Sequence, residues 1–345
     1  MEEIAARAKV HRTTVSMALR DHPKLPAATR ERIKAIAREM GYIPNPLVSA
    51  LMRYRAGRRS PNFQGEIAYF TNEQNEQAWQ EPLAYQKVFS GARQRAEEIG
   101  FHLVPLWLRQ PGMTARRLNK ILFQRGIHAA IVSPQLGQPA SLDWVDWTRI
   151  SAVAVGYSLQ SPHLHRVAHD YFHAMTTAVE NTLALGFRRP GLILSKSADA
   201  RADHLWLGSW FAMKEQHPEL LPPLVWGRPN VRTFAPVKTY LRRHRPDALC
   251  VLPNTKFETL LPWSGKLPCP RRISLGCYDL DHDEPGIYQN YELIGRVAVD
   301  QVTGALFRSE RGVPRQSHDT LVRGIWSGKI ALEQQTAGRV PIFFT

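Results

Sequence analysis

Side chains that can bind nucleic-acid bases gather near the amino terminus, on a segment whose apolar residues predict a short helix. The spacing places Val15 and Ala18 on an inward face and Arg12, Thr13 and Ser16 on the outward one. Guanidinium and hydroxyl groups at the start of an exposed helix can hydrogen-bond to base edges and phosphates in a DNA groove. These residue types therefore point to DNA recognition.

Two further helices are expected to hold this one in place. One covers residues 2–8 and the other about 27–40, and their inward faces carry small or aliphatic residues: Ile4, Ala5, Ala8, Ile33, Ile36, Ala37 and Met40. Two short helices around a tight turn, braced by a third, form a helix-turn-helix motif. A three-helix bundle with another role has the same periodicity, so the pattern alone leaves both interpretations open.

The formal net charge of +15 is unevenly distributed along the 345 residues. Residues 1–60 contain 13 Lys and Arg against 5 Asp and Glu, a net charge of +8. Such a concentration favours binding of a polyanion by this segment. A generally basic protein explains the charge equally well when the charge is considered alone.

Cysteine usage and hydropathy predict a cytoplasmic protein. Cys250, Cys269 and Cys277 are odd in number and match no metal-binding spacing, which favours a reducing compartment. No apolar run approaches the length of about 18 residues that a spanning helix needs. The acidic start at Glu2 and Glu3 does not resemble a signal peptide.

After about residue 62, short apolar runs alternate with amphipathic helices. Strands are expected at 67–70, 101–108, 129–133, 152–156, 192–195, 248–252 and 273–276, and helices at 88–99, 118–122, 174–185, 205–214 and 293–307. This alternation predicts an α/β fold with parallel sheets, in which ligands bind beyond the carboxyl ends of the strands.

The amino-terminal residues resemble the DNA-binding head of lac-repressor type (LacI/GalR) regulators. The resemblance rests on an ordered set of positions: Ile4-Ala5, Ala8, Val10, Thr14-Val15-Ser16, Ala18-Leu19, Thr29-Arg30, Ile33 and the run 41–45. It implies that Arg12, Thr13 and Met17 occupy base-reading positions. It also implies contacts to the DNA backbone from Thr14, Ser16, Thr29, Tyr42 and Asn45.

By the same resemblance, residues 46–53 match the hinge helix of this family. This segment includes Val48 and Leu51, and Leu51 aligns with the leucine that enters the minor groove. An apolar wedge of this kind unstacks a base step and bends the duplex. A solvated linker helix is the alternative interpretation of this segment.

Two positions depart from the family pattern in the head. Lys9 stands in the turn where the family usually has Gly, and a left-handed Lys costs about 1 kcal/mol. Met17 replaces the more common Arg, so it can pack against an apolar base edge but cannot form two hydrogen bonds to guanine.

Several later segments resemble the two-lobed, periplasmic-binding-protein-like sensor that follows the head in this family. They are residues 167–170, 185–189, 276–279, 289–295 and 321–324. The resemblance implies that Asp170, Asn254, Asp279 and Gln289 face an effector cleft, although each could instead cap a strand–helix turn.

Trp206 stands where the family often has a ligand-binding Arg, and an indole there favours stacking on a sugar ring or on an aromatic compound. Together with the four polar residues, it predicts a neutral, hydroxyl-rich effector such as a sugar. Arg201, in the preceding loop, is the residue that could replace the missing cation.

The expected organisation is a helix-turn-helix head at 1–45 and a hinge helix and linker at 46–61. An effector-binding and dimerisation domain follows at 62–345, with lobe 1 at 62–159 and 290–317 and lobe 2 at 160–289 and 318–345.

The sequence therefore predicts a homodimeric repressor that binds a pseudo-palindromic operator, needs no cofactor or metal and catalyses no reaction. One alternative is a metal-dependent enzyme, because His163, His165, His169 and His173 lie near Asp170. The other is a ligand-binding protein of the same body fold without a role at DNA.

Overall fold

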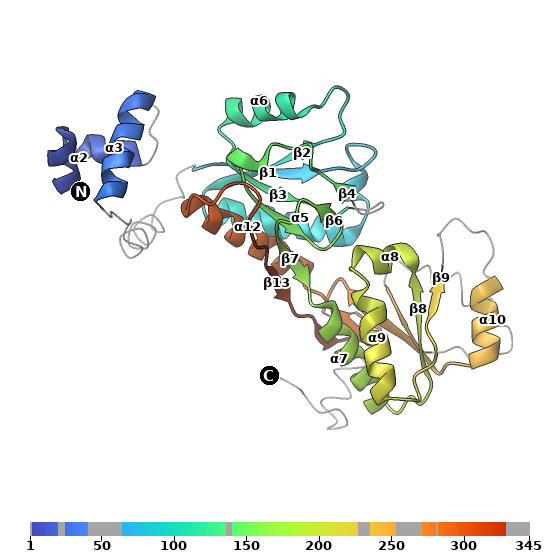
Figure 1. Cartoon of the computed structure of the whole chain (residues 1–345). Coiled ribbons are helices and arrows are strands. Elements are labelled where there is room, and N and C mark those ends of the chain that lie inside the picture. Colours follow the sequence, from blue (N-terminus) through green and yellow to red (C-terminus); the bar gives the residue numbers. More distant parts are fainter. Residues whose placement is uncertain are drawn as a thin grey trace. The chain divides into compact units, whose positions relative to one another are not determined.

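The computed structural model describes residues 2–19, 25–40, 64–135, 140–226, 235–252, 271–280 and 282–328. The chain divides into two compact units, Met1–Asn62 and Phe63–Thr345 (Figure 1). No described helix is long and apolar enough to cross a membrane.

The first unit consists of three short helices around a small core. They are α1 (Glu2–Ala8), α2 (Arg12–Leu19) and α3 (Ala27–Glu39). The buried side chains are Ile4, Ala5, Ala8, Val15, Ala18, Ile33 and Ala37, which confirms the inward faces predicted from the spacing. The turn between α1 and α2 passes through Lys9 at φ +52°, so this Lys does adopt the left-handed conformation expected of it.

The second unit begins with a six-stranded sheet in the order β13-β7-β5-β3-β1-β2. All neighbouring strands are parallel: β1 (Gly65–Thr71), β2 (Phe101–Trp107), β3 (Ala129–Val132), β5 (Ser151–Val155), β7 (His165–His169) and β13 (Asp319–Val322). One face packs against α5 (Leu83–Glu98) and α12 (Tyr291–Phe307), and the other against α6 (Ala115–Arg125). This layer is the first lobe.

A second six-stranded sheet forms the second lobe, in the order β14-β12-β11-β10-β8-β9. Its strands are β8 (Pro190–Ser195), β9 (Leu224–Trp226), β10 (Ala248–Val251), β11 (Arg271–Cys277), β12 (Gly286–Tyr288) and β14 (Ile325–Ser327). Pairing is parallel except between β12 and β14. Its helices are α7 (Tyr171–Ala184), α8 (Lys196–Arg201), α9 (Leu205–Gln216) and α10 (Ala235–His244).

The strands and helices expected from apolar periodicity are confirmed, but the lobe boundaries expected near residues 160 and 318 are wrong. Both β7 and β13 were expected in the second lobe. The structure instead pairs β7 with β5 and β13 with β7, which places both strands at the edge of the first sheet. The chain therefore crosses into the second lobe only after each of these strands ends.

Candidate functional site

The start of α2 presents polar side chains on the surface of the first unit. Arg12 and Thr13 are exposed, whereas Val15 and Ala18 on the other face are buried. The Thr13 backbone N–H donates to Nδ1 of His11 at 3.3 Å, and the same nitrogen lies 2.9 Å from the Thr13 hydroxyl. This local hydrogen bonding holds the first turn of α2 in place behind the side chains expected to read bases.

The other expected DNA contacts are less fully described. Met17, Thr14 and Thr29 are partly buried in the first unit. Ser16 lies within α2, and its side chain is not among those that the structure describes. Four further candidates lie outside the described residues: Tyr42, Asn45, Val48 and Leu51.

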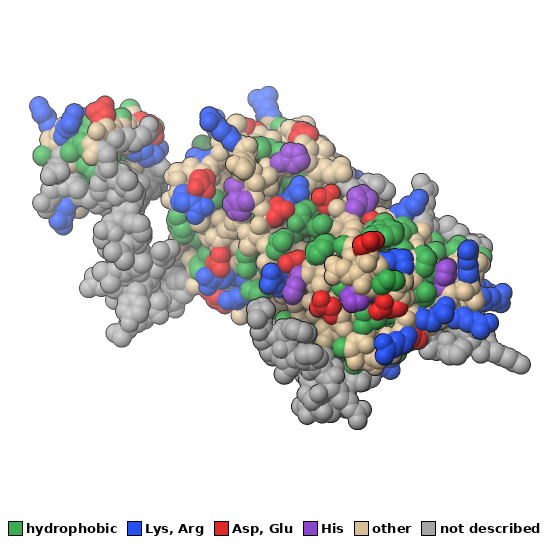
Figure 2. Space-filling view, turned by 60° about the horizontal axis from the view of Figure 1, so that its bottom comes forward, with side chains coloured by type: hydrophobic (Ala, Val, Ile, Leu, Met, Phe, Trp, Pro, Cys, Tyr) green, Lys and Arg blue, Asp and Glu red, His purple; other side chains and the backbone are tan. Residues whose placement is uncertain are grey.

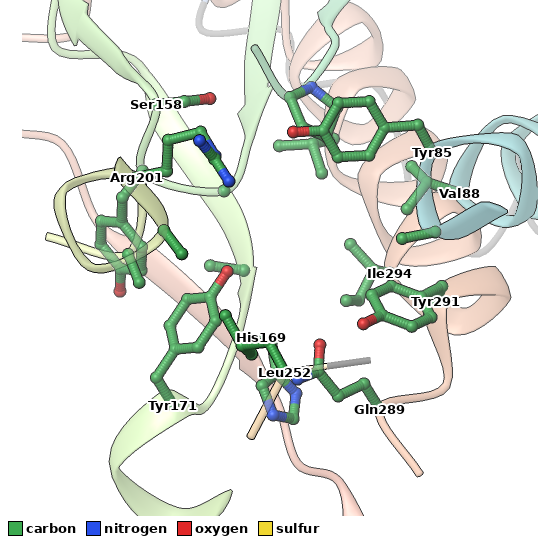
Figure 3. A pocket seen from close by; sticks show the side chains of 18 of the residues that line it. Tyr85, Val88, Ser158, His169, Tyr171, Arg201, Leu252, Gln289, Tyr291 and Ile294 are labelled. Carbon is green, nitrogen blue, oxygen red and sulfur yellow. The ribbon is translucent and has the colours of Figure 1, made fainter. Parts of the chain in front are cut away.

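A cavity of about 150 Å³ lies between the two lobes of the second unit (Figure 3). Helices α5 and α12 of the first lobe contribute Tyr85 and Tyr291 to its wall. Helices α8 and α9 of the second lobe contribute Arg201 and Trp206, and β7 ends at the cavity with His169. The cavity thus lies beyond the carboxyl end of a parallel strand, where α/β folds bind ligands.

Two of the expected effector residues do line this cavity. Trp206 is only 2% exposed, and its ring meets that of Tyr171 edge-on with 4.9 Å between centroids. Gln289 is 4% exposed, and its Nε2 donates to the Leu275 carbonyl at 2.6 Å. Asn254, a third expected residue, lies outside the described residues.

The expectation that Asp170 lines the cavity is wrong. Asp170 is the N-cap of α7, where its Oδ1 accepts a hydrogen bond from the His173 backbone N–H at 3.0 Å. Its Oδ2 lies 3.5 Å from Nε of Arg323. The strand-end position was predicted correctly, but the carboxylate satisfies the helix terminus and does not reach the cavity wall.

The same expectation is wrong for Asp279. Its side chain is 73% exposed, and it accepts a hydrogen bond from Nζ of Lys87 at 3.2 Å. Lys87 also donates to Glu292 at 2.7 Å, and these carboxylates raise the pKa of Lys87. Because Lys87 lies on α5 and Asp279 follows β11, this ion pair joins the two lobes.

Several polar or aromatic residues of the cavity are not predicted as effector-binding from the sequence: Tyr85, Tyr157, Ser158, His169, Tyr171, Arg201 and Tyr291. The sequence suggests His169 only as a metal ligand and Arg201 only as a replacement cation. The four tyrosines belong to no local motif, so no sequence pattern identifies them.

Burial dominates the electrostatics of the cavity. It lowers the pKa of His169 to about 3, so the imidazole is neutral at physiological pH. Burial also raises the pKa of Tyr85 and Tyr171, and the nearby Arg201 guanidinium opposes that effect at both phenols. Among the described residues, the cavity is therefore lined by neutral phenols and a neutral imidazole beside one cation, Arg201.

The histidines of the metal-site alternative do not gather in one place. His165 stacks on His318 with 4.0 Å between ring centroids, whereas His169 lines the cavity. Within the described ranges, no group of three or more His, Cys, Asp or Glu residues is placed to hold a metal ion.

Acidic and basic side chains both occur on the surface of the second unit. Figure 2 shows them on the visible face, with a group of Lys and Arg at its lower right edge. Several pairs are in contact, such as Arg125 with Glu66 at 2.8 Å and Arg296 with Glu98 at 2.8 Å. This mixed surface contrasts with the excess of positive charge in residues 1–60.

Comparison with known proteins identifies relatives of the amino-terminal segment in particular. Residues 1–45 match the family described as bacterial regulatory proteins, lacI family. An HTH-type transcriptional regulator of Mycolicibacterium smegmatis is 27% identical over 194 residues, 56% of this chain and 50% of that protein. The HTH-type transcriptional repressor CytR of Escherichia coli is 47% identical over 47 residues, 14% of each chain. The chain matches half the length of the first of these curated relatives, and less of the second.

Among solved structures, the lac repressor dimer bound to operator and the anti-inducer ONPF resembles the chain across both units. The similarity covers 94% of this chain and 96% of that one, with a TM-score of 0.51 at 16% sequence identity. At this level of identity, the similarity shows a shared fold: a helix-turn-helix head followed by a two-lobed α/β domain with parallel sheets.

Proposed function

We propose that this chain, whose residues 1–45 are a lacI-family helix-turn-helix domain, is a transcription repressor that binds a specific operator. The observation that carries the proposal is the start of α2, where Arg12 and Thr13 are exposed within a segment that matches the family. In helix-turn-helix proteins the residues at this end of the second helix contact base edges in the major groove.

We propose further that two copies of the chain bind one pseudo-palindromic site. A helix-turn-helix head reads only a short half-site, and a dimer with twofold symmetry reads two of them. The lac repressor structure that shares this fold is a dimer bound to its operator, which supports the proposal. In this arrangement, Leu51 of each copy would enter the minor groove between the half-sites.

The cavity between the lobes is the proposed effector site. It is lined by elements of both lobes, so a bound molecule can contact both of them at once. A ligand shifts DNA occupancy only if it binds one lobe arrangement more tightly than another. Ion pairs between the lobes, such as Lys87 with Asp279, are contacts that such a shift would alter.

The test is selection of binding sites from random duplex DNA by the full-length protein, followed by sequencing of the retained fragments. The expected result is one enriched motif with two inverted half-sites, bound as a dimer in a mobility-shift assay. Failure to enrich any motif, with binding that depends on DNA length alone, would refute the proposal of a sequence-specific regulator.

A further inference from the structure

Several polar groups of the cavity are already used by the protein itself. Tyr85 donates its hydroxyl hydrogen to the Gln135 carbonyl at 3.2 Å, and the Ser158 hydroxyl accepts from the Gln135 backbone N–H at 2.8 Å. Gln289 directs its Nε2 to the Leu275 carbonyl. Each of these contacts occupies one donor or acceptor of the residue, and only the remaining groups can bind a ligand.

His169 is the polar group whose hydrogen bonds are missing. The side chain is buried, and neither ring nitrogen has a hydrogen bond that meets the usual distance and angle limits, although an interaction with the Val322 backbone acts to raise its pKa. Figure 3 shows the ring at the edge of the cavity, beside Gln289. A neutral imidazole offers one donor and one acceptor, so a ligand can supply the partner that the protein does not.

Arg201 is the one charged side chain among the described residues that line the cavity. Its guanidinium reaches into the cavity from α8, away from His169 and Gln289 (Figure 3). No described Asp or Glu lines the cavity. Guanidinium groups bind carboxylates with two parallel hydrogen bonds, which is stronger than their binding of neutral acceptors.

The wall chemistry restricts the ligand further. A cavity of about 150 Å³ is large enough for at least one benzene-sized ring. The rings of Tyr171, Trp206 and Tyr291 line it together with aliphatic side chains such as Val88 and Ile294. Aromatic and aliphatic walls of this kind favour a flat, apolar ring.

We propose that the effector is a single-ring aromatic carboxylate whose carboxylate binds Arg201 and whose polar ring substituent hydrogen-bonds to His169. The inference rests on the proposed function in so far as it takes this cavity to be the effector site. It differs from the neutral, hydroxyl-rich effector expected from the sequence. That expectation relied on a cleft lined by Asp170, Asp279, Gln289 and Trp206, of which only the last two line the cavity.

The test is calorimetric titration of the full-length protein with 4-hydroxybenzoate, its neutral analogue 4-hydroxybenzamide, and methyl β-glucoside. Other single-ring carboxylates, such as salicylate and nicotinate, complete the panel. We expect binding of at least one carboxylate and much weaker binding of its amide and of the glucoside. Arg201→Gln should weaken carboxylate binding about 10- to 100-fold, because it removes a charge-assisted contact.

The matched control is Lys196→Gln, which removes one positive charge from the exposed start of the same helix, outside the cavity. This variant should bind the carboxylate as the wild type does. His169→Phe keeps a ring in the buried position but removes both nitrogens, and it should weaken 4-hydroxybenzoate more than benzoate.

Three results would overturn the inference: no response to any carboxylate of the panel, tighter binding of the glucoside than of the carboxylates, or equal losses in Arg201→Gln and Lys196→Gln. Each of these outcomes concerns the ligand alone. Because operator binding is measured separately by site selection, the inference can fail while the proposed DNA-binding function holds.

Discussion

Helices α5 and α12 cross at two glycines, and the substitution Gly295→Ala is expected to destabilise the second unit. A Cβ atom at position 295 would lie 2.0 Å from the Val88 carbonyl oxygen and 2.7 Å from the Ala92 nitrogen. A Cβ at Gly91 would lie 2.1 Å from the Glu292 carbonyl oxygen. These neighbours are backbone atoms, so relief of the overlap requires the two helices to separate.

The magnitude follows from two opposing effects. Overpacking of a close-packed core costs roughly 1–3 kcal/mol, and more where the backbone must move. Replacing Gly by Ala inside a helix contributes about 1 kcal/mol in the stabilising direction. Since backbone atoms are involved at Gly295, we expect a net loss of about 2 kcal/mol, which corresponds to a fall in Tm of roughly 4–8 °C for a domain of this size.

Denaturant unfolding followed by tryptophan fluorescence is the appropriate assay, because all nine tryptophans follow residue 62 and report on the second unit. The matched control is Gly208→Ala in α9, where a Cβ meets no atom within 4 Å and where a gain of up to about 1 kcal/mol is expected. An unfolding midpoint of Gly295→Ala at or above that of the wild type would refute the close-crossing argument.

Four further outcomes are expected. Arg12→Ala should cost roughly 1–3 kcal/mol of operator binding and relax the preference at one base pair per half-site, and an unchanged selected motif would show that Arg12 does not read bases. Leu51→Ala should weaken binding to the operator but leave binding to random DNA nearly unchanged in mobility-shift titrations, because a wedge contributes only where DNA is kinked. Asp279→Asn should retain the ligand response, because the exposed ion pair between Asp279 and Lys87 contributes only about 0–1 kcal/mol. Loss of the response in this variant would show that the Asp279 carboxylate takes part in effector binding. Because the folded-state pKa of His169 is about 3, below the unfolded value near 6.5, stability should fall as the pH drops from 7 to 5, and denaturant melts should show a smaller fall in His169→Phe.

The three helices of the first unit could be predicted because their information is local. Residues at i, i+3 and i+4 share a helix face, so Ile4, Ala8, Ile33 and Ala37 could be assigned to the core from spacing alone. The exposure of Arg12 follows from the same geometry, because burial of one face leaves the opposite face to solvent.

The pairing of strands is harder to predict from the sequence than their positions. The resemblance indicates strands at β7 and β13 but does not say which sheet each one joins, because neighbouring strands in both sheets are mostly parallel. Only the hydrogen-bonded registers Val155 with Val167 and Leu321 with Ala168 place these strands in the first lobe. Lobe boundaries therefore depended on long-range pairing that sequence periodicity does not specify.

The cavity shows why a strand-end rule identifies the location of a site better than its chemistry. A cavity does lie beyond β7, but Asp170 caps α7, whereas His169, one residue earlier, lines the cavity. Asp170 follows the last residue of the strand, so the first turn of the next helix takes its carboxylate and the neighbouring imidazole lies at the cavity. The loss of Asp170 and the presence of Arg201 act in the same direction, because each makes the cavity more positive. Trp206 thus occupies the position where the family often has an Arg, while the cavity receives a cation from another helix, Arg201 of α8.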